Sequence, residues 1–180
     1  MSTEGEARPA ARLTVLAGPS GTGRESVVEL VRARSPAVWS PVPATTRPPR
    51  AGERPGTDRL FCDPVEFDRM AAAGELLEWS RIGPYARGTP AAQVRARLAA
   101  GQPVLLPLDL PGAIGVRAVL PDARLVLLVP PGFDPAPATL AETDAVVVHD
   151  LTERTVTELV GLLGSSLPAP ARSPLGGRAT

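Results

Sequence analysis

The sequence predicts an α/β fold with a mostly parallel sheet that carries helices on both faces. The first observation is that several aliphatic runs are continuous rather than alternating, which is typical of strands buried on both sides. The second is that segments with a helical spacing of apolar residues lie between these runs, and such alternation favours a parallel sheet. The third is size: 180 residues, 43% of them hydrophobic, are enough for one domain with a substantial core.

The amino-terminal half begins with a strand, a turn and a helix. The run RLTVLA at 12–17 leads into a glycine-rich turn and predicts a buried strand. The segment 25–35 has valines and a leucine at helical spacing and predicts an amphipathic helix. Proline, glycine and arginine dominate 41–59, which we expect to form a loop or a small irregular subdomain. A further helix is expected within 64–79, ending near Gly74.

The carboxy-terminal half continues this alternation. The segment 89–101 predicts a helix with Thr89 as its N-cap, Pro90 at its first position and Gly101 just past its end. Further aliphatic runs predict three buried strands, and an amphipathic segment after them predicts a closing helix. The strands are expected at 103–110, 123–131 and 144–150, and the helix at 151–164.

Composition excludes several classes of function. The formal net charge is zero, so we expect neither a nucleic acid polymer nor a membrane as a partner. One cysteine and one histidine exclude a disulfide framework and a multi-histidine metal site. No apolar run is long enough for a membrane helix or a signal peptide, which predicts a cytoplasmic protein. We expect one domain over 12–164, with disordered segments at 1–11 and 165–180.

The motif GPSGTGRES at 18–26 is close to the phosphate-binding loop pattern G-x-x-x-x-G-K-[ST]. Arg24 stands where lysine is expected, and the sequence contains no lysine that could replace it. Backbone N–H groups of such a loop bind phosphates, and the Ser26 hydroxyl is expected to bind Mg²⁺ if ATP is used. Arg24 and Ser26 are therefore the candidate catalytic residues. The predicted loop residues are Gly18, Ser20, Gly21, Thr22, Gly23, Arg24, Glu25 and Ser26.

Further along the chain, the sequence resembles the guanylate kinase family, whose members move a phosphate from ATP to GMP. The matching pieces follow the family order over 12–131 and again over 144–164. They are LTVLAGPSGTG, ATTRPPRAGERPG, EF with GELLEW, GTP, LDLPGA, PDARLVLLVPP and DAVVVHD. The resemblance implies a P-loop nucleoside monophosphate kinase-like fold with a small GMP-binding subdomain.

The resemblance also implies an acceptor site. Arg47 and Arg50 of TTRPPR match the family arginines that bind the GMP phosphate, and guanidinium groups suit phosphate oxygens. Glu78 matches the carboxylate that accepts N–H groups of guanine, while Thr89 and Asp109 match further positions of the nucleoside pocket.

Two more arginines stand where the family has phosphate-facing tyrosines. They are Arg59 and Arg87. If both face the site, four arginines surround one anion, which suits a ligand more negative than GMP or one phosphate held tightly. The alternative is that both side chains point to solvent.

Other differences from the family bear on catalysis. Pro43 and Pro107 stand where the family has a serine and an aspartate, and Glu25 stands where it has a small residue. The connection 132–143 is short and has no arginine, so the resemblance implies that the mobile lid over ATP is missing.

These differences favour a protein that binds a phosphorylated ligand with weak or no phosphotransfer to GMP. The ligand would be a nucleotide or a phosphorylated protein segment. The alternative is an active phosphotransferase that uses Mg²⁺ and ATP on GMP or on a different phosphorylated acceptor. In that case Arg59 or Arg87 could stand in for the arginines of the lid.

Overall fold

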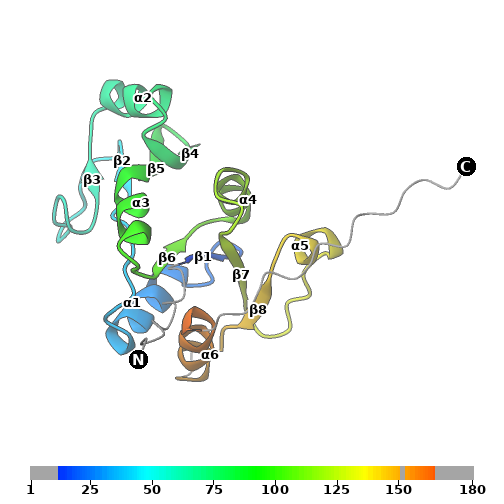
Figure 1. Cartoon of the computed structure of the whole chain (residues 1–180). Helices are drawn as coiled ribbons and strands as arrows, with labels where there is room; N and C mark the ends of the chain where they lie inside the picture. Colours follow the sequence, from blue (N-terminus) through cyan, green and yellow to red (C-terminus); the bar gives the residue numbers. More distant parts are fainter. Residues whose placement is uncertain (1–11, 151–152, 165–180) are drawn as a thin grey trace, which may run out of the picture.

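The computed structural model describes residues 12–150 and 153–164, which are built around a parallel sheet (Figure 1). The strand order is β6-β1-β7-β8, and each neighbouring pair is parallel. Every residue of β1 and β7 is buried, so the continuous aliphatic runs identified the central strands correctly. The strands are β1 Leu13–Ala17, β6 Val104–Pro107, β7 Arg124–Val129 and β8 Ala145–Val148.

Helices cover both faces of this sheet, which confirms the predicted α/β fold. On one face, Val27 and Leu159 belong to one apolar core, and on the other face Val94 and Val116 belong to a second. The first face is covered by α1 Arg24–Arg34 and α6 Glu153–Gly164, the second by α3 Ala91–Ala99 and α4 Leu110–Val119. No helix in the described part of the chain combines the length and the apolarity of a membrane span.

The turn that follows β1 opens at the carboxyl edge of the sheet. Leu16 of β1 lies opposite Pro107 of β6 and Val126 of β7, so β1 is a central strand flanked on both sides. Open parallel sheets bind ligands at this edge. The loop 18–23 and the start of α1 therefore lie where a ligand is expected.

A second sheet forms a separate subdomain, drawn at the upper left of Figure 1. Its order is β3-β2-β5-β4, and Phe67 of α2 is buried against it with Ala44, Leu76 and Ala86. Its elements are β2 Ala44–Thr45, β3 Leu60–Phe61, α2 Pro64–Ala72, β4 Leu76–Ile82 and β5 Tyr85–Pro90.

The sequence predicted α2 and its end but missed this second sheet. Gly74 has a φ of 68° just after α2, which suits the predicted stop. Strands β2 and β3 have two residues each, too few for a periodic pattern. In β4 the exposed Trp79 and Ile82 break the regular alternation of apolar and polar residues.

Two boundaries differ from the prediction. The N-cap assigned to Thr89 is wrong, because Thr89 belongs to β5 and Pro90 occupies the cap. The run 103–110 is not all strand, because Asp109 caps α4 by accepting a hydrogen bond from the Gly112 N–H at 2.8 Å. Helix α4 itself was not predicted.

The connection between β7 and β8 contains one short helix, α5 Pro137–Ala141. The turn at Gly132, with a φ of 77°, leads from β7 toward this helix. The segments 1–11 and 165–180, predicted to be disordered, lie outside the described residues, as do residues 151–152 at the start of the predicted closing helix.

Candidate functional site

The predicted phosphate-binding loop forms a compact turn between β1 and α1. Gly21 and Gly23 have φ values of 83° and 69°, a left-handed conformation that glycine adopts without strain. The Thr22 hydroxyl donates to the Pro19 carbonyl at 2.8 Å and closes the turn. The backbone N–H groups at the start of α1 therefore face the edge of the sheet, the arrangement that binds phosphate in such loops.

Gly18 is required by close packing rather than by its backbone angles. A Cβ atom at this position would lie 2.4 Å from the carbonyl oxygen of Leu128 in β7. We expect Gly18→Ala to push the loop away from β7 and to lower the free energy of unfolding by about 1–3 kcal/mol. Denaturant titration checks this. Gly21→Ala is the matched control for crowding, because a Cβ there meets no atom within 4 Å and only its φ is strained.

Arg24 folds back over the loop. Its guanidinium donates a hydrogen bond to the carbonyl oxygen of Gly18. Burial lowers the pKa of Arg24, while the nearby carboxylate of Asp109 raises it. To contact a phosphate, this side chain must leave the Gly18 carbonyl, a movement that its length permits.

Ser26 lies in the first turn of α1 with its side chain exposed. One hydroxyl is a suitable protein ligand for Mg²⁺, which usually keeps several waters and takes its other ligands from phosphates. Ser26 thus fits the role predicted for it. The described residues contain no cluster of three or more histidine, cysteine or acidic side chains that could hold a metal by themselves.

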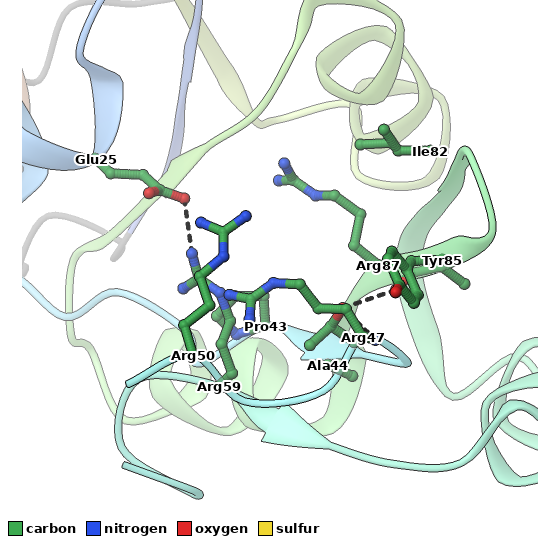
Figure 2. A pocket seen from close by; sticks show the side chains of 11 residues that line it. Glu25, Pro43, Ala44, Arg47, Arg50, Arg59, Ile82, Tyr85 and Arg87 are labelled. Atoms are coloured by element: carbon green, nitrogen blue, oxygen red, sulfur yellow. Dashed lines mark hydrogen bonds and ion pairs between the residues drawn. The ribbon is translucent and has the colours of Figure 1, made fainter. Parts of the chain in front are cut away.

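Four arginines line one cavity of about 350 Å³ beside the loop, which we call the arginine pocket (Figure 2). They come from different parts of the chain, the 47–59 segment and β5. Its side chains are those of Arg47, Arg50, Arg59 and Arg87, with Glu25, Pro43, Ala44, Thr45, Ile82, Tyr85 and Ala86. Arg59 and Arg87 therefore both line this cavity, as expected if they face a common site rather than bulk solvent.

Glu53 holds Arg47 in position. Its two carboxylate oxygens accept from both terminal nitrogens of Arg47, one at 2.7 Å, and one of them also accepts from the Arg50 N–H at 2.8 Å. These hydrogen bonds hold the pKa of Glu53 at about 2, so the contact is present above the usual value near 4.5 and is lost as pH falls toward 2. The ring of Phe61 lies 5.8 Å from the Arg47 guanidinium and fixes it further.

An ion pair joins the loop to the small subdomain. The carboxylate of Glu25, in the first turn of α1, lies 3.0 Å from the guanidinium of Arg59. Figure 2 shows Glu25 reaching this arginine across the mouth of the arginine pocket. Because Glu25 is two-thirds exposed, the pair contributes little to stability, and its main effect is on where Arg59 points.

Glu78 and Thr89 form a polar pair on adjacent strands of the second sheet. The Thr89 hydroxyl donates to Glu78 at 2.7 Å, and the two residues are in register between β4 and β5. Burial raises the pKa of Glu78, and the carboxylate of Asp109 adds to the rise. A Cβ atom on Gly112 would lie 2.9 Å from an oxygen of Asp109 and 3.6 Å from an oxygen of Glu78. The predicted residues Glu78, Thr89 and Asp109 therefore lie close together. They are not part of the lining of the arginine pocket.

Glu53 and His149 are two residues of the site that the sequence did not point to. Glu53 follows the arginine motif closely, and the excess of positive charge there is the signal that could have indicated it. His149 follows β8, and its Nε2 atom would lie 3.6 Å from a Cβ on Gly23. Its buried Nδ1 has no hydrogen-bond partner among the described residues. Only the sheet order brings His149 beside the loop.

A glycine-rich loop between a central strand and a helix, next to a small subdomain rich in arginine, defines a P-loop nucleoside monophosphate kinase-like protein. The sequence model of the guanylate kinase family matches residues 10–154. The chain belongs to the guanylate kinase family.

Several relatives support this assignment. A guanylate kinase from Thermobifida fusca is 55% identical over 123 residues, which are 68% of this chain and 63% of that protein. One from Nocardia farcinica is 51% identical over 146 residues, 78% of this chain and 76% of that protein. The chain thus spans just under two thirds of the length of the Thermobifida relative.

A longer alignment and a solved structure agree with these matches. A guanylate kinase from Parasynechococcus marenigrum is 37% identical over 177 residues, with 84% of this chain and 97% of that protein covered. The crystal structure of guanylate kinase from Anaplasma phagocytophilum superposes with a TM-score of 0.67, covering 87% of this chain and 86% of that one. At 23% identity, this likeness supports the fold alone.

Proposed function

We propose that this protein transfers the terminal phosphoryl group of ATP to GMP. The observation that supports the proposal most is that the hollow at the glycine-rich loop and the arginine pocket share a wall residue. Residues 21–26 of the loop line a hollow of about 250 Å³ that also has Arg87 in its wall, and the same Arg87 lines the arginine pocket. A donor phosphate on the loop and an acceptor phosphate among the arginines would therefore meet at one place, as direct transfer requires.

Each half of the proposed reaction has its own residues. Gly21, Gly23 and the start of α1 would bind the phosphates of ATP, and the Ser26 hydroxyl would help to hold Mg²⁺. When bound, that ion offsets negative charge on the phosphates. Arg47 and Arg50 would bind the phosphate of GMP, as the relatives' shared name of guanylate kinase also suggests.

Glu78 would recognise the guanine base. Its carboxylate, held by Thr89, can accept hydrogen bonds from the N–H donors of guanine. Asp109 lies beside it and would limit which ring atoms can approach.

The affinity for GMP is expected to depend on pH through Glu78. The carboxylate form binds guanine, and burial raises its pKa above the usual value near 4.5. Affinity should therefore decrease as pH falls through the raised pKa. The effect on folding has the opposite sign, because a raised carboxyl pKa contributes stability that is lost as pH rises. Calorimetric titration of GMP between about pH 5 and 8 measures the first effect.

Glu78→Gln is expected to remove the part of this pH dependence that Glu78 contributes, to leave the part due to the second ionisation of the GMP phosphate at about pH 6, and to reduce the preference for GMP over AMP. The matched control is Glu66→Gln on the exposed surface of α2, where the profile should match the wild type. A pH profile and a preference for GMP over AMP that are the same in Glu78→Gln and in the wild type would exclude Glu78 from base recognition.

A second candidate function is binding of a phosphorylated ligand without efficient turnover, the function that the sequence favoured. Two observations support it: Arg24 is bound to the Gly18 carbonyl, and the segment 132–143 provides no arginine. The names of the relatives give it no support, since those cited above are called guanylate kinases. We therefore place it second.

The test is ADP formation from MgATP, with GMP and then with other phosphorylated acceptors. Arg47→Ala and Arg81→Ala should be purified in parallel, because any contaminating host kinase would appear in both. Arg81 is exposed on β4 and pairs with Asp68, away from the arginine pocket. At a GMP concentration near the wild-type KM, we expect turnover close to the wild type in Arg81→Ala and far lower turnover in Arg47→Ala, because the substitution raises KM for GMP. Binding of GMP without turnover would favour the second candidate.

A further inference from the structure

We propose that Arg87 is the catalytic arginine, contacting the phosphoryl group while it moves from ATP to GMP. This inference rests on the proposed function. It places on β5 the positive charge that stabilises the phosphoryl group in transfer, because the segment 132–143 has no arginine or lysine to supply it.

The first argument is position. Arg87 is in the wall of the arginine pocket, of the hollow around the loop 18–26, and of a larger groove of about 900 Å³ between α1 and the 51–59 segment. Among the four arginines of the arginine pocket, only Arg87 also lines the loop hollow. It therefore lies at the junction between the donor and acceptor sides.

The second argument is that the Arg87 side chain is available. Glu53 binds Arg47, and Glu25 binds Arg59. Within the described residues, the guanidinium groups of Arg50 and Arg87 form no hydrogen bond or ion pair, and Arg50 does not reach the loop hollow. Figure 2 shows Arg87 extending into the open centre of the arginine pocket.

The third argument is the nearness of a second cation. Arg24 and Arg87 both line the hollow around the loop, and the charge of Arg87 adds to the burial that lowers the pKa of Arg24. Two cations side by side repel each other unless an anion lies between them. A transferring phosphoryl group, with charge spread over three oxygens, is such an anion.

The fourth argument is that the backbone of Arg87 is held firmly. Arg87 is in register with Thr45 of β2 on one side and Ser80 of β4 on the other. The preceding residue, Ala86, accepts from the Thr45 hydroxyl at 2.9 Å, and its N–H donates to the Thr46 hydroxyl at 2.8 Å. A rigid base places a long side chain with less loss of entropy than a mobile loop does.

In the proposed step, the bond between the terminal phosphorus of ATP and the bridging oxygen breaks, and its electron pair stays on the β-phosphate of ADP. A new bond forms to an oxygen of the GMP phosphate and gives GDP. A doubly ionised GMP phosphate loses no proton. Arg87 would donate to the oxygens of the group in transfer, where a well-placed arginine is worth about 10³–10⁵ in rate.

The test compares Arg87→Gln with Arg50→Gln, a matched loss of one arginine that lines only the acceptor side. We expect Arg87→Gln to lower kcat about 10³-fold with the GMP dissociation constant changed less than about threefold, and Arg87→Lys to recover part of the loss. Arg50→Gln should instead raise KM for GMP and leave kcat within about threefold. Thermal melting confirms that the variants are folded.

A binding measurement that needs no turnover separates failure of this inference from failure of the proposed function. The probe is adenosine and guanosine joined by five phosphates, which spans both sites. Arg87→Gln is expected to weaken it at least about tenfold more than it weakens GMP. If the wild type has no turnover, the proposed function fails, and this selective loss would still support the junction role of Arg87. An equal loss for both ligands, no loss, or a higher KM with unchanged kcat overturns the inference.

Discussion

Arg24→Ala is expected to lower kcat for phosphoryl transfer about 10²–10³-fold, the usual cost of removing one donor to a developing charge. The residue begins α1 directly after the glycine turn, where its guanidinium can reach phosphates bound to the loop. Arg24→Lys is expected to exceed the wild type several-fold, because a compact ammonium fits between two phosphates better than a planar guanidinium. Steady-state kinetics with varied MgATP and saturating GMP measures both changes.

The control for the Arg24 series is Arg34→Ala, at the far end of the same helix. Arg34 pairs with the exposed Glu153 of α6 and lies away from the loop, so kcat should stay within about twofold. Unchanged kcat in Arg24→Ala would mean that Arg24 remains bound to the Gly18 carbonyl throughout the reaction. Lower turnover in Arg24→Lys than in the wild type would mean that the loop has adapted to the longer side chain.

Arg47→Ala is expected to raise KM for GMP about 10²-fold, with a smaller effect on kcat. The substitution removes a charged donor from the arginine pocket and leaves the charge of Glu53 without a cation, so this carboxylate would then repel the acceptor phosphate. Calorimetry with GMP alone gives the matching change in the dissociation constant and does not depend on turnover.

Arg47→Ala both removes a charged donor and leaves the negative charge of Glu53 uncompensated, and Glu53→Gln separates these two effects. The amide keeps one acceptor for Arg47 and carries no charge, so the arginine is held less firmly but nothing repels the phosphate. We expect KM for GMP to rise about tenfold, between the wild type and Arg47→Ala. A rise equal to that of Arg47→Ala would show that the position of Arg47 matters more than its charge. GMP affinity unchanged in both variants would place the acceptor phosphate elsewhere.

Local sequence predicted the central sheet, because each strand is buried by its own composition, and it predicted the covering helices α1, α3 and α6 but not α4. The aliphatic runs that became β1 and β7 had no polar alternation, and the glycine turn between β1 and α1 had a recognisable spacing. The second sheet could not be predicted in this way. Its two-residue strands, β2 and β3, pair with segments far along the chain, and Thr89 was mistaken for a helix cap because its partner, Glu78, lies on another strand.

The candidate site likewise contains residues that local motifs predicted and residues that only contacts across the fold revealed. The loop residues and Arg47, Arg50 and Glu78 could be chosen from motifs, because their roles follow from the type of side chain and the spacing. Motifs could not decide whether Arg59 and Arg87 face solvent, and they gave no indication of Glu53 or His149. Contacts across the fold decide these points: Glu25 pairs with Arg59, Glu53 holds Arg47, and His149 lies beside Gly23.

The sequence by itself therefore determined the fold class, the glycine-rich loop and the presence of a cluster of arginines after it, since periodicity, glycine spacing and charged motifs are local properties. The tertiary structure alone decided that Arg87 lies in the walls of both the loop hollow and the arginine pocket. That position depends on how the second sheet is placed against the carboxyl edge of the first. Such a placement arises from contacts between residues distant in sequence, which a local pattern does not encode.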